Sequence, residues 1–209
     1  MDNMKLADLN IKEFLAKTAS GSPVPGGGSI AALSAATAAS LVEMVANLTI
    51  GKKGFEEKKE QMKDIVKKAA DYRNEAIKDI DKDSDAYSDV LTAFRLPKSS
   101  EQEKNDRKQA IQDAFKNASL VPLGVAKNAF RITQLAEKVV KYGNKNAVTD
   151  GAVAVMMART AVLSALYNVK INLSSINDMD FVERVRKDVI SLENQIEEKE
   201  RKILLGVTI

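Results

Sequence analysis

The side chains that could carry acid–base chemistry in this sequence of 209 residues are carboxylates, lysines and tyrosines, because the chain contains no His and no Cys. These absences exclude thiol nucleophiles, disulfides, Ser-His-Asp triads and zinc sites built from Cys or His. Proton transfer must then fall to Asp, Glu, Lys, Tyr or water. A carboxylate with a shifted pKa is therefore the first group to look for.

Four alternating aspartates, from Asp79 to Asp85, form the densest acidic cluster. An EF-hand loop that started at Asp81 would need Gly at its sixth and Glu at its twelfth position, where the chain has Ala86 and Thr92. Calcium binding by this motif is excluded. On a helix the alternate acids spread around the axis, so spacing alone selects no functional carboxylate among them. We expect most to be solvated and Asp85 to cap a helix.

A glycine-rich loop, PVPGGGS, occupies residues 23–29. Its letters fit the G-x-G-x-x-A form of the dinucleotide fingerprint, but the loop follows Pro-Val-Pro and no predicted strand, so that interpretation is rejected. A glycine loop that leads into a helix exposes free N–H groups, which favour an anion or a polar ligand edge. A tight turn that lets two helices touch is an equally good interpretation.

Polar residues also gather where two apolar helices are predicted to end or begin. Lys52 and Lys53 follow the first of these helices, Asn144 and Asp150 precede the second, and Asn172 is predicted to follow its far end. The lysines could clamp an anion or simply complement the helix dipole. The Asn and Asp residues could orient a ligand or simply form turns and an N-cap.

Composition and periodicity predict an all-α fold, a single multihelical bundle-like domain spanning residues 1–209. Hydrophobic residues make up 44% of the chain and aromatic residues 5%, and Gly and Pro are scarce. The segments 29–48 and 150–167 are apolar or small on nearly every side, so we expect two central buried helices.

The remaining periodic segments are amphipathic and are expected to surround these two. Short and long helices are predicted over 11–20 and 55–80, the latter pattern continuing to Leu96-Pro97. Ser100 and Glu103 form a capping-box pattern that opens the next helix. Pro122 predicts a kink or a restart in it, and Gly143 its end. A last helix over 178–205 could cover the core or meet the same helix in a second copy.

Charge and hydropathy constrain the partners. The net charge is +3 (32 Lys and Arg minus 29 Asp and Glu), without a block of like charges, so nucleic acid is not the expected partner. The uncharged stretches 29–42 and 151–158 fall short of the ~20 apolar residues of a membrane span. The absence of Cys and of a signal-peptide pattern favours the cytoplasm.

Seven short segments resemble one protein family when they are taken together and in order. They are PVPGGGS (23–29), EMVANLT (43–49) with GKK (51–53), DAY (85–87), LPK (96–98), VPL (121–123), GNKN (143–146) with Asp150, and NL (172–173). This set resembles the cyclodeaminase domain of formiminotransferase-cyclodeaminase and its stand-alone relatives, which include methenyltetrahydrofolate cyclohydrolases. The resemblance covers nearly the whole chain.

The resemblance implies a helical homodimer that acts on the carbon between N5 and N10 of tetrahydrofolate. The first candidate reaction is hydrolysis of 5,10-methenyltetrahydrofolate to 10-formyltetrahydrofolate. The alternative reaction is closure of 5-formiminotetrahydrofolate to the methenyl form with release of ammonia. A third hypothesis is a non-catalytic folate-binding or scaffold dimer. Neither reaction requires a metal, and no cofactor is expected besides the tetrahydrofolate substrate. We expect the final helix to form the dimer contact.

The same resemblance suggests residue roles. Asp85 and Asp150 would face the pterin or the cationic amidinium, and Lys98 would donate a proton. Asn144 and Asn172 would orient the ligand or water. Lys52 and Lys53 would meet the glutamate tail. The ligand's seat would be shaped by the glycine loop, namely Pro25, Gly26, Gly27, Gly28 and Ser29.

Overall fold

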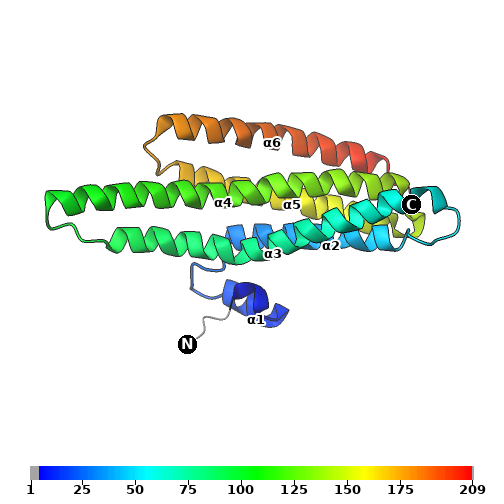
Figure 1. Ribbon diagram of the computed structural model, residues 1–209, viewed down its shortest axis with the longest axis horizontal. Coiled ribbons are helices and arrows are strands. Elements are labelled where there is room, and N and C mark those ends of the chain that lie inside the picture. Colours follow the sequence, from blue (N-terminus) through cyan, green and yellow to red (C-terminus); the bar gives the residue numbers. More distant parts are fainter. Residues whose placement is uncertain (1–4, 209) are drawn as a thin grey trace.

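Six α-helices and three short 3-10 helices make up residues 5–208, the part of the chain that the computed structural model describes, with no strand among them (Figure 1). The predicted all-α bundle is confirmed. In chain order the elements are η1 (Leu6–Asp8), α1 (Ile11–Thr18), α2 (Gly27–Asn47), η2 (Glu56–Lys58), α3 (Lys59–Arg95), α4 (Glu101–Tyr142), η3 (Lys145–Ala147), α5 (Val148–Leu173) and α6 (Met179–Leu205).

The centre of the bundle is the pair α2 and α5, which pack against each other along their lengths. Their facing sides are built from small residues, and the prediction of two buried central helices is confirmed. The fully buried alanines are Ala31, Ala32, Ala38, Ala39 and Ala46 on α2, and Ala154, Ala158, Ala161 and Ala165 on α5. Because alanine ends at Cβ, the two helix axes can approach closely.

Length and apolar composition alone would allow two stretches, Gly27–Asn47 and Lys145–Leu173, to cross a membrane. In the folded chain 61% and 50% of their most apolar windows are buried inside the protein. The buried helix of a water-soluble bundle has the same composition, because it faces other helices on most sides.

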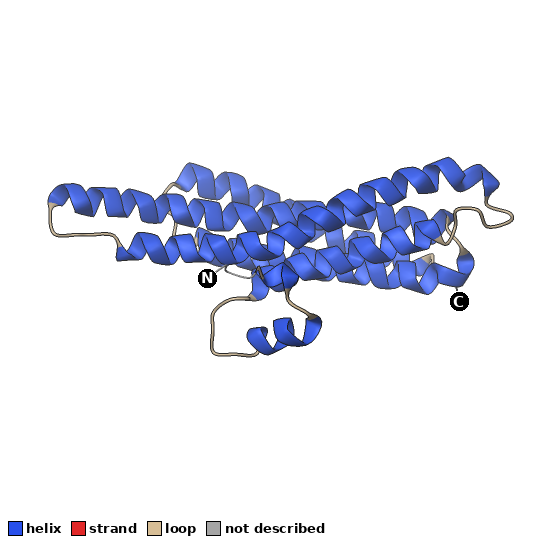
Figure 2. Ribbon diagram, turned by 60° about the horizontal axis from the view of Figure 1, so that its bottom comes forward, coloured by secondary structure: helices blue, strands red, loops and turns tan. Residues whose placement is uncertain are grey.

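The long helices α3 and α4 cover one side of this pair, and α6 packs over α4 and α5 (Figures 1 and 2). The predicted capping box is present: Ser100 accepts from the Glu103 N–H, and the Glu103 side chain accepts from the Ser100 N–H. The α3–α4 hairpin extends beyond α2 and α5, and Phe94 and Phe115 pack edge to face there, with ring centres 6.1 Å apart.

Helix α3 runs unbroken to Arg95, so the prediction that Asp85 caps a helix is wrong. Asp85 is exposed in the interior of α3. The physical reason is the apolar stripe of α3, which continues through Ile80, Ala86 and Val90 without a break. Burial of that stripe against the rest of the bundle outweighs the local preference of Asp for a helix start.

One predicted boundary in the second half of the chain is also wrong, and of the two alternatives at Pro122, a kink or a restart, the restart is excluded. Pro122 starts no new helix, because α4 continues through it from Glu101 to Tyr142. Asn172 does not follow α5 but lies in its last turn, since α5 extends to Leu173. Gly143, by contrast, ends α4 as predicted.

The final helix α6 covers the core of its own chain. Its apolar stripe, which includes Val185, Val189 and Ile196, is buried. This stripe is therefore not free to meet a second copy, whereas a dimer contact through the outer side of α6 stays a prediction. Exposed large apolar residues are also found on α2, at its C-cap and on α5, among them Met44, Leu48, Met156 and Tyr167.

The short helix α1 stands beside the start of α2 (Figure 1). Its segment is held by two buried side chains, Leu6 and Phe14. The backbone N–H of Leu6 also donates to Oδ1 of Asp81 on α3 at 2.6 Å. This anchoring places the following loop, with Pro25 and the glycines, across the end of the bundle.

Candidate functional site

A cavity of about 310 Å³ opens where α2 begins and α5 ends. That volume lies near the lower end of the range of about 300–1,000 Å³ that is usual for small-molecule sites. Four helices and the glycine loop contribute to its walls. They are lined by Pro23, Val24, Gly26, Gly27 and Gly28 from the loop and α2, Asp83, Ala86, Tyr87 and Val90 from α3, Ala118 from α4, and Asn168, Ile171 and Asn172 from α5.

Among the described residues, Asp83 is the one carboxylic acid that lines this cavity. Its side chain reaches across from α3 to the start of α2. There the buried Ser29 hydroxyl lies 2.9 Å from the Ile80 carbonyl oxygen and 3.3 Å from Oδ2 of Asp83. A Cβ atom on Gly28 would lie 1.9 Å from Oδ1 of Asp83, so only glycine leaves room for the carboxyl.

The surroundings of Asp83 favour its neutral form. Burial raises the pKa of the Asp83 carboxyl above its ordinary value, and hydrogen bonds from the hydroxyl and the backbone N–H of Ser29 oppose part of that shift. Tyr87 is the only other titratable side chain from the described part of the chain that lines the cavity. Asp83 can therefore keep a proton at a higher pH than a surface aspartate can, and it can donate that proton to a bound ligand.

The α5 wall of the cavity carries two amides. Asn168 donates through Nδ2 to the Ser164 carbonyl at 2.9 Å, and Asn172 donates through Nδ2 to the Ala118 carbonyl at 2.7 Å. No cationic side chain of residues 5–208 lines the cavity. The described walls thus combine one carboxylic acid, two amides and the rim hydroxyl of Tyr87.

The predicted glycine-loop residues divide between the wall and its support. Gly26, Gly27 and Gly28 line the cavity. Pro25 is buried and follows a cis peptide bond with Val24, and Ser29 lies behind the wall, where it contacts Asp83. From the sequence, the N–H groups at the start of α2 were expected to favour an anion or a polar ligand edge. In the structure the carboxyl of Asp83 lies at this helix start.

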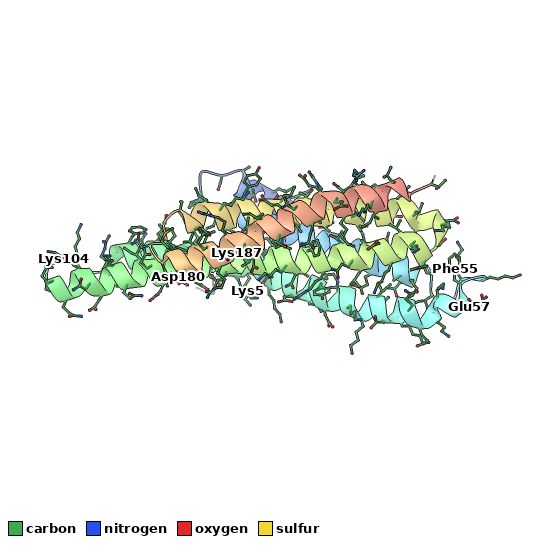
Figure 3. All side chains as sticks on the ribbon, turned by 90° about the horizontal axis from the view of Figure 1, so that it is seen from above. Lys5, Phe55, Glu57, Lys104, Asp180 and Lys187 are labelled. Atoms are coloured by element: carbon green, nitrogen blue, oxygen red, sulfur yellow. The ribbon has the colours of Figure 1, made fainter. Side chains whose placement is uncertain are left out.

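A second polar cluster lies at the opposite end of α2, about 30 Å away for a helix of this length. There the Lys52 ammonium donates to Oδ1 of Asn144. The Asn144 N–H donates to Oγ1 of Thr49 at 2.9 Å, and its side-chain amide donates to the Leu48 carbonyl at 3.2 Å. In Figure 3 the label of Phe55 marks this end of the molecule, and the label of Lys104 marks the opposite end.

The remaining predicted residues lie outside the cavity of the same chain. Asp150 is partly buried in the first turn of α5, at the end that carries Lys52 and Asn144. Lys53 is exposed in the turn after α2. Asp85 is exposed on α3, and Lys98 is exposed in the α3–α4 connection. Within one chain, the structure unites the glycine loop with Asn172 and leaves the other predicted residues apart from them.

Known proteins are similar to this chain in sequence and in fold. A family model described as formiminotransferase-cyclodeaminase matches residues 10–191. The chain belongs to this family. A methenyltetrahydrofolate cyclohydrolase from Methylorubrum extorquens is 39% identical over 87% of this chain and 88% of its own length. The formimidoyltransferase-cyclodeaminase of Rattus norvegicus is 30% identical over 90% of this chain, which spans only 35% of that protein.

A solved relative agrees in fold along almost the whole chain. The crystal structure of a formiminotetrahydrofolate cyclodeaminase from Thermotoga maritima superposes with a TM-score of 0.87 at 31% identity. The match covers 97% of this chain and 98% of that one. The bundle described above is thus the fold of the formiminotransferase-cyclodeaminase family.

Sequence analysis missed Asp83, although a usable signal was present. On a helix, Asp83 follows Ile80 by three residues and precedes Tyr87 by four, so it lies on the same side as the apolar stripe. Asp85, two residues further on, faces the other way. A carboxylate on the apolar side of an amphipathic helix is the position that predicts burial and a shifted pKa.

No group of three or more Asp or Glu side chains that could hold a metal ion occurs among residues 5–208. In this member of the formiminotransferase-cyclodeaminase family, the described residues offer a carboxylic acid in a small cavity.

Proposed function

We propose that this chain is a methenyltetrahydrofolate cyclohydrolase. The carrying observation is the carboxyl of Asp83 in a cavity at the end of the bundle. The similarity of the whole chain to a cyclohydrolase of nearly the same extent supports the reaction. Hydrolysis needs no thiol or imidazole, in keeping with a chain that has neither Cys nor His.

The reaction needs one group that moves protons. Water adds its oxygen to the cationic carbon that bridges N5 and N10, and one proton leaves. The resulting hydroxyl then gives up its proton while the C–N5 bond breaks and N5 gains a proton, which leaves a formyl group on N10. In this proposal the carboxylate form of Asp83 takes the proton from the attacking water or hydroxyl. The neutral acid that results, which burial favours, then delivers the proton to N5, and this is general acid–base catalysis.

A cyclodeaminase is the second candidate, supported by the solved Thermotoga relative. In that reaction N10 attacks the formimino carbon on N5, loses its proton, and ammonia leaves. The tetrahedral carbon again lies between N5 and N10, and Asp83 would again carry the proton to the departing nitrogen. The two functions therefore use one site and differ in the leaving group.

We further propose a homodimer through the uncovered faces of α2 and α5. A group of exposed apolar side chains on one side of a protein is typical of an interaction surface. The residues here are Met44 on α2, Leu48 at its C-cap, and Val153, Met156, Tyr167 and Ile171 on α5. Packing two copies of this helix pair together would bury them in a four-helix arrangement.

A two-fold axis perpendicular to the bundle would pair opposite ends of the two copies. The end with Lys52, Asn144 and Asp150 of one copy would then approach the cavity of the other. This arrangement would unite residues that lie about 30 Å apart within one chain. In the dimer, Asp150 would face the cationic ligand, and Lys52 and Lys53 would approach its glutamate tail.

The localisation and the class of partner are proposed from the sequence. We propose a cytoplasmic enzyme whose partner is a small folate rather than nucleic acid or a membrane. The small net charge of +3 supports this proposal.

The activity is tested with 5,10-methenyltetrahydrofolate, by following the loss of its near-ultraviolet absorbance. The wild-type protein should accelerate this loss over the spontaneous rate. Asp83→Asn should lower turnover by about 10²–10⁴-fold, the usual contribution of a general acid or base. Asp85→Asn, on the exposed side of the same helix, is the matched control and should keep full turnover.

An inactive wild-type protein would refute the cyclohydrolase, and ammonia release from 5-formiminotetrahydrofolate would then test the cyclodeaminase. Absence of both activities with tight tetrahydrofolate binding would leave the folate-binding dimer. Equal turnover of Asp83→Asn and wild type would remove Asp83 from the mechanism.

The dimer is tested by sedimentation velocity. Met156→Glu places a charge on the proposed interface and should give a folded monomer, whereas Ile190→Glu, at an exposed site on α6, should remain dimeric. A wild-type monomer would refute the dimer.

A further inference from the structure

Pro122 leaves a gap in the hydrogen bonds of α4, next to the cavity. Proline has no backbone N–H, so it cannot donate to the carbonyl four residues earlier in a helix. In α4 that carbonyl belongs to Ala118, which lines the cavity. A buried carbonyl without a donor is costly, and another group is expected to satisfy it.

Asn172 on α5 provides that donor. Its Nδ2 lies 2.7 Å from the Ala118 carbonyl oxygen. A carbonyl oxygen can only accept, so the nitrogen of the amide, and not its oxygen, must face Ala118. The orientation of the Asn172 amide is thereby fixed by the proline on the neighbouring helix.

The oxygen of this amide remains for a ligand. Asn172 lines the cavity, and no described donor of the protein bonds to its Oδ1. Asn168, one turn earlier, is oriented in the same way by its bond to the Ser164 carbonyl, next to the open space that Gly27 leaves. The α5 wall thus offers amide oxygens, which are hydrogen-bond acceptors.

We infer that Pro122 and Asn172 form a pair that determines ligand specificity, in which the proline turns the Asn172 oxygen toward the cavity to accept from an N–H edge of the ligand. The inference rests on the proposed function for the identity of that edge. In a reduced folate it is the amino-pyrimidinone end of the pterin, with its 2-amino group and N3–H. Among residues 5–208, no Lys or Arg side chain lines the cavity.

The test compares two ligands by calorimetry: tetrahydrofolate and an analogue in which methyl replaces the 2-amino group. Wild type should bind the analogue about 10- to 100-fold more weakly, because one acceptor in the cavity stays unpaired. Asn172→Leu should bring this ratio close to one. Asn172→Leu should also lower the thermal midpoint, because the Ala118 carbonyl loses its donor.

The double variant Asn172→Leu with Pro122→Ala separates ligand recognition from structural support. Alanine at position 122 returns a helical N–H to the Ala118 carbonyl, so the thermal midpoint should recover. The ligand ratio should stay near one, because no side-chain oxygen has been restored. Pro97→Ala, in the exposed α3–α4 connection, is the control and should rescue neither property.

Each outcome bears on the inference. If wild type and Asn172→Leu both bind tetrahydrofolate and show the same ratio of affinities for tetrahydrofolate and the analogue, the inference is overturned while the proposed function stands. If the double variant recovers the ratio together with its stability, Asn172 is structural only, and the inference is again overturned. A wild-type protein that binds neither ligand would refute both the inference and the folate function.

Discussion

The contact between Gly28 and Asp83 predicts that Gly28→Ala disrupts the site. The new Cβ would lie 1.9 Å from Oδ1 and 2.3 Å from Cγ of Asp83, against ordinary contacts of 3.4 Å or more. The carboxyl must therefore shift by about 1.5 Å (3.4 − 1.9). It would lose its contact with Ser29 and move within, or out of, the cavity.

The free-energy terms have opposite signs but unequal sizes. Overpacking costs about 1–3 kcal/mol, and losing the Ser29 contact costs about 0.5–1.5 kcal/mol. Alanine in place of glycine in a helix returns up to about 1 kcal/mol. The net loss of about 0.5–3.5 kcal/mol should lower the thermal midpoint by about 2–4 °C for each kcal/mol in a chain of this length.

Gly124→Ala is the matched control, because Gly124 lies inside α4 with no neighbouring atom within 4 Å of the new Cβ. It should stabilise the protein by up to about 1 kcal/mol. Thermal unfolding by circular dichroism and the hydrolysis assay measure both variants, and only Gly28→Ala should lose activity. The decisive background is Asp83→Ala, in which Gly28→Ala should no longer destabilise. An unchanged cost in that background would refute the steric explanation.

Three further outcomes follow from other contacts. Ser100→Ala removes the α4 cap and should cost about 1 kcal/mol in urea unfolding, with no change in turnover; a loss within error would show that the cap does not matter. Asp81→Ala removes the acceptor of the Leu6 N–H and should speed proteolytic cleavage before α2, and an unchanged cleavage rate would contradict this anchoring. Burial raises the pKa of Asp79 despite its bond to Lys82, so the stability from the neutral acid is present below the ordinary pKa and lost as pH rises through the raised value. Asp79→Asn should therefore gain thermal stability relative to wild type as pH increases from 4 to 8, and a constant difference would contradict the shift.

Periodicity was sufficient to predict the helices because most of them carry a strong apolar stripe. The two central helices, the capping box at Ser100 and the helix end at Gly143 all follow from local rules. Local rules did not predict the ends of α5 or the continuity of α3 through Asp85. Packing against neighbouring helices extends a helix past residues such as Asp85 that favour a boundary.

The site was harder to predict for a physical reason. Asp83 and Gly28 are 55 residues apart in the sequence, and their contact exists only after α2 and α3 pack together. The same holds for Asn172 and the carbonyl freed by Pro122. Local sequence shows each group, but the shifted pKa and the fixed amide orientation arise from the partner that folding supplies.

The alanine-rich contact between α2 and α5 bears on how this protein can respond to a ligand. Alanine has no side-chain rotamers, so the centre of the bundle cannot repack in steps as a core of leucine or methionine can. Sliding one helix along the other would have to move whole backbones. Conformational adjustment to the ligand should then be confined to the glycine loop and to the rotamers of Tyr87 and Ile171. The pair α2 and α5 should move as one rigid unit that connects the two ends of the molecule.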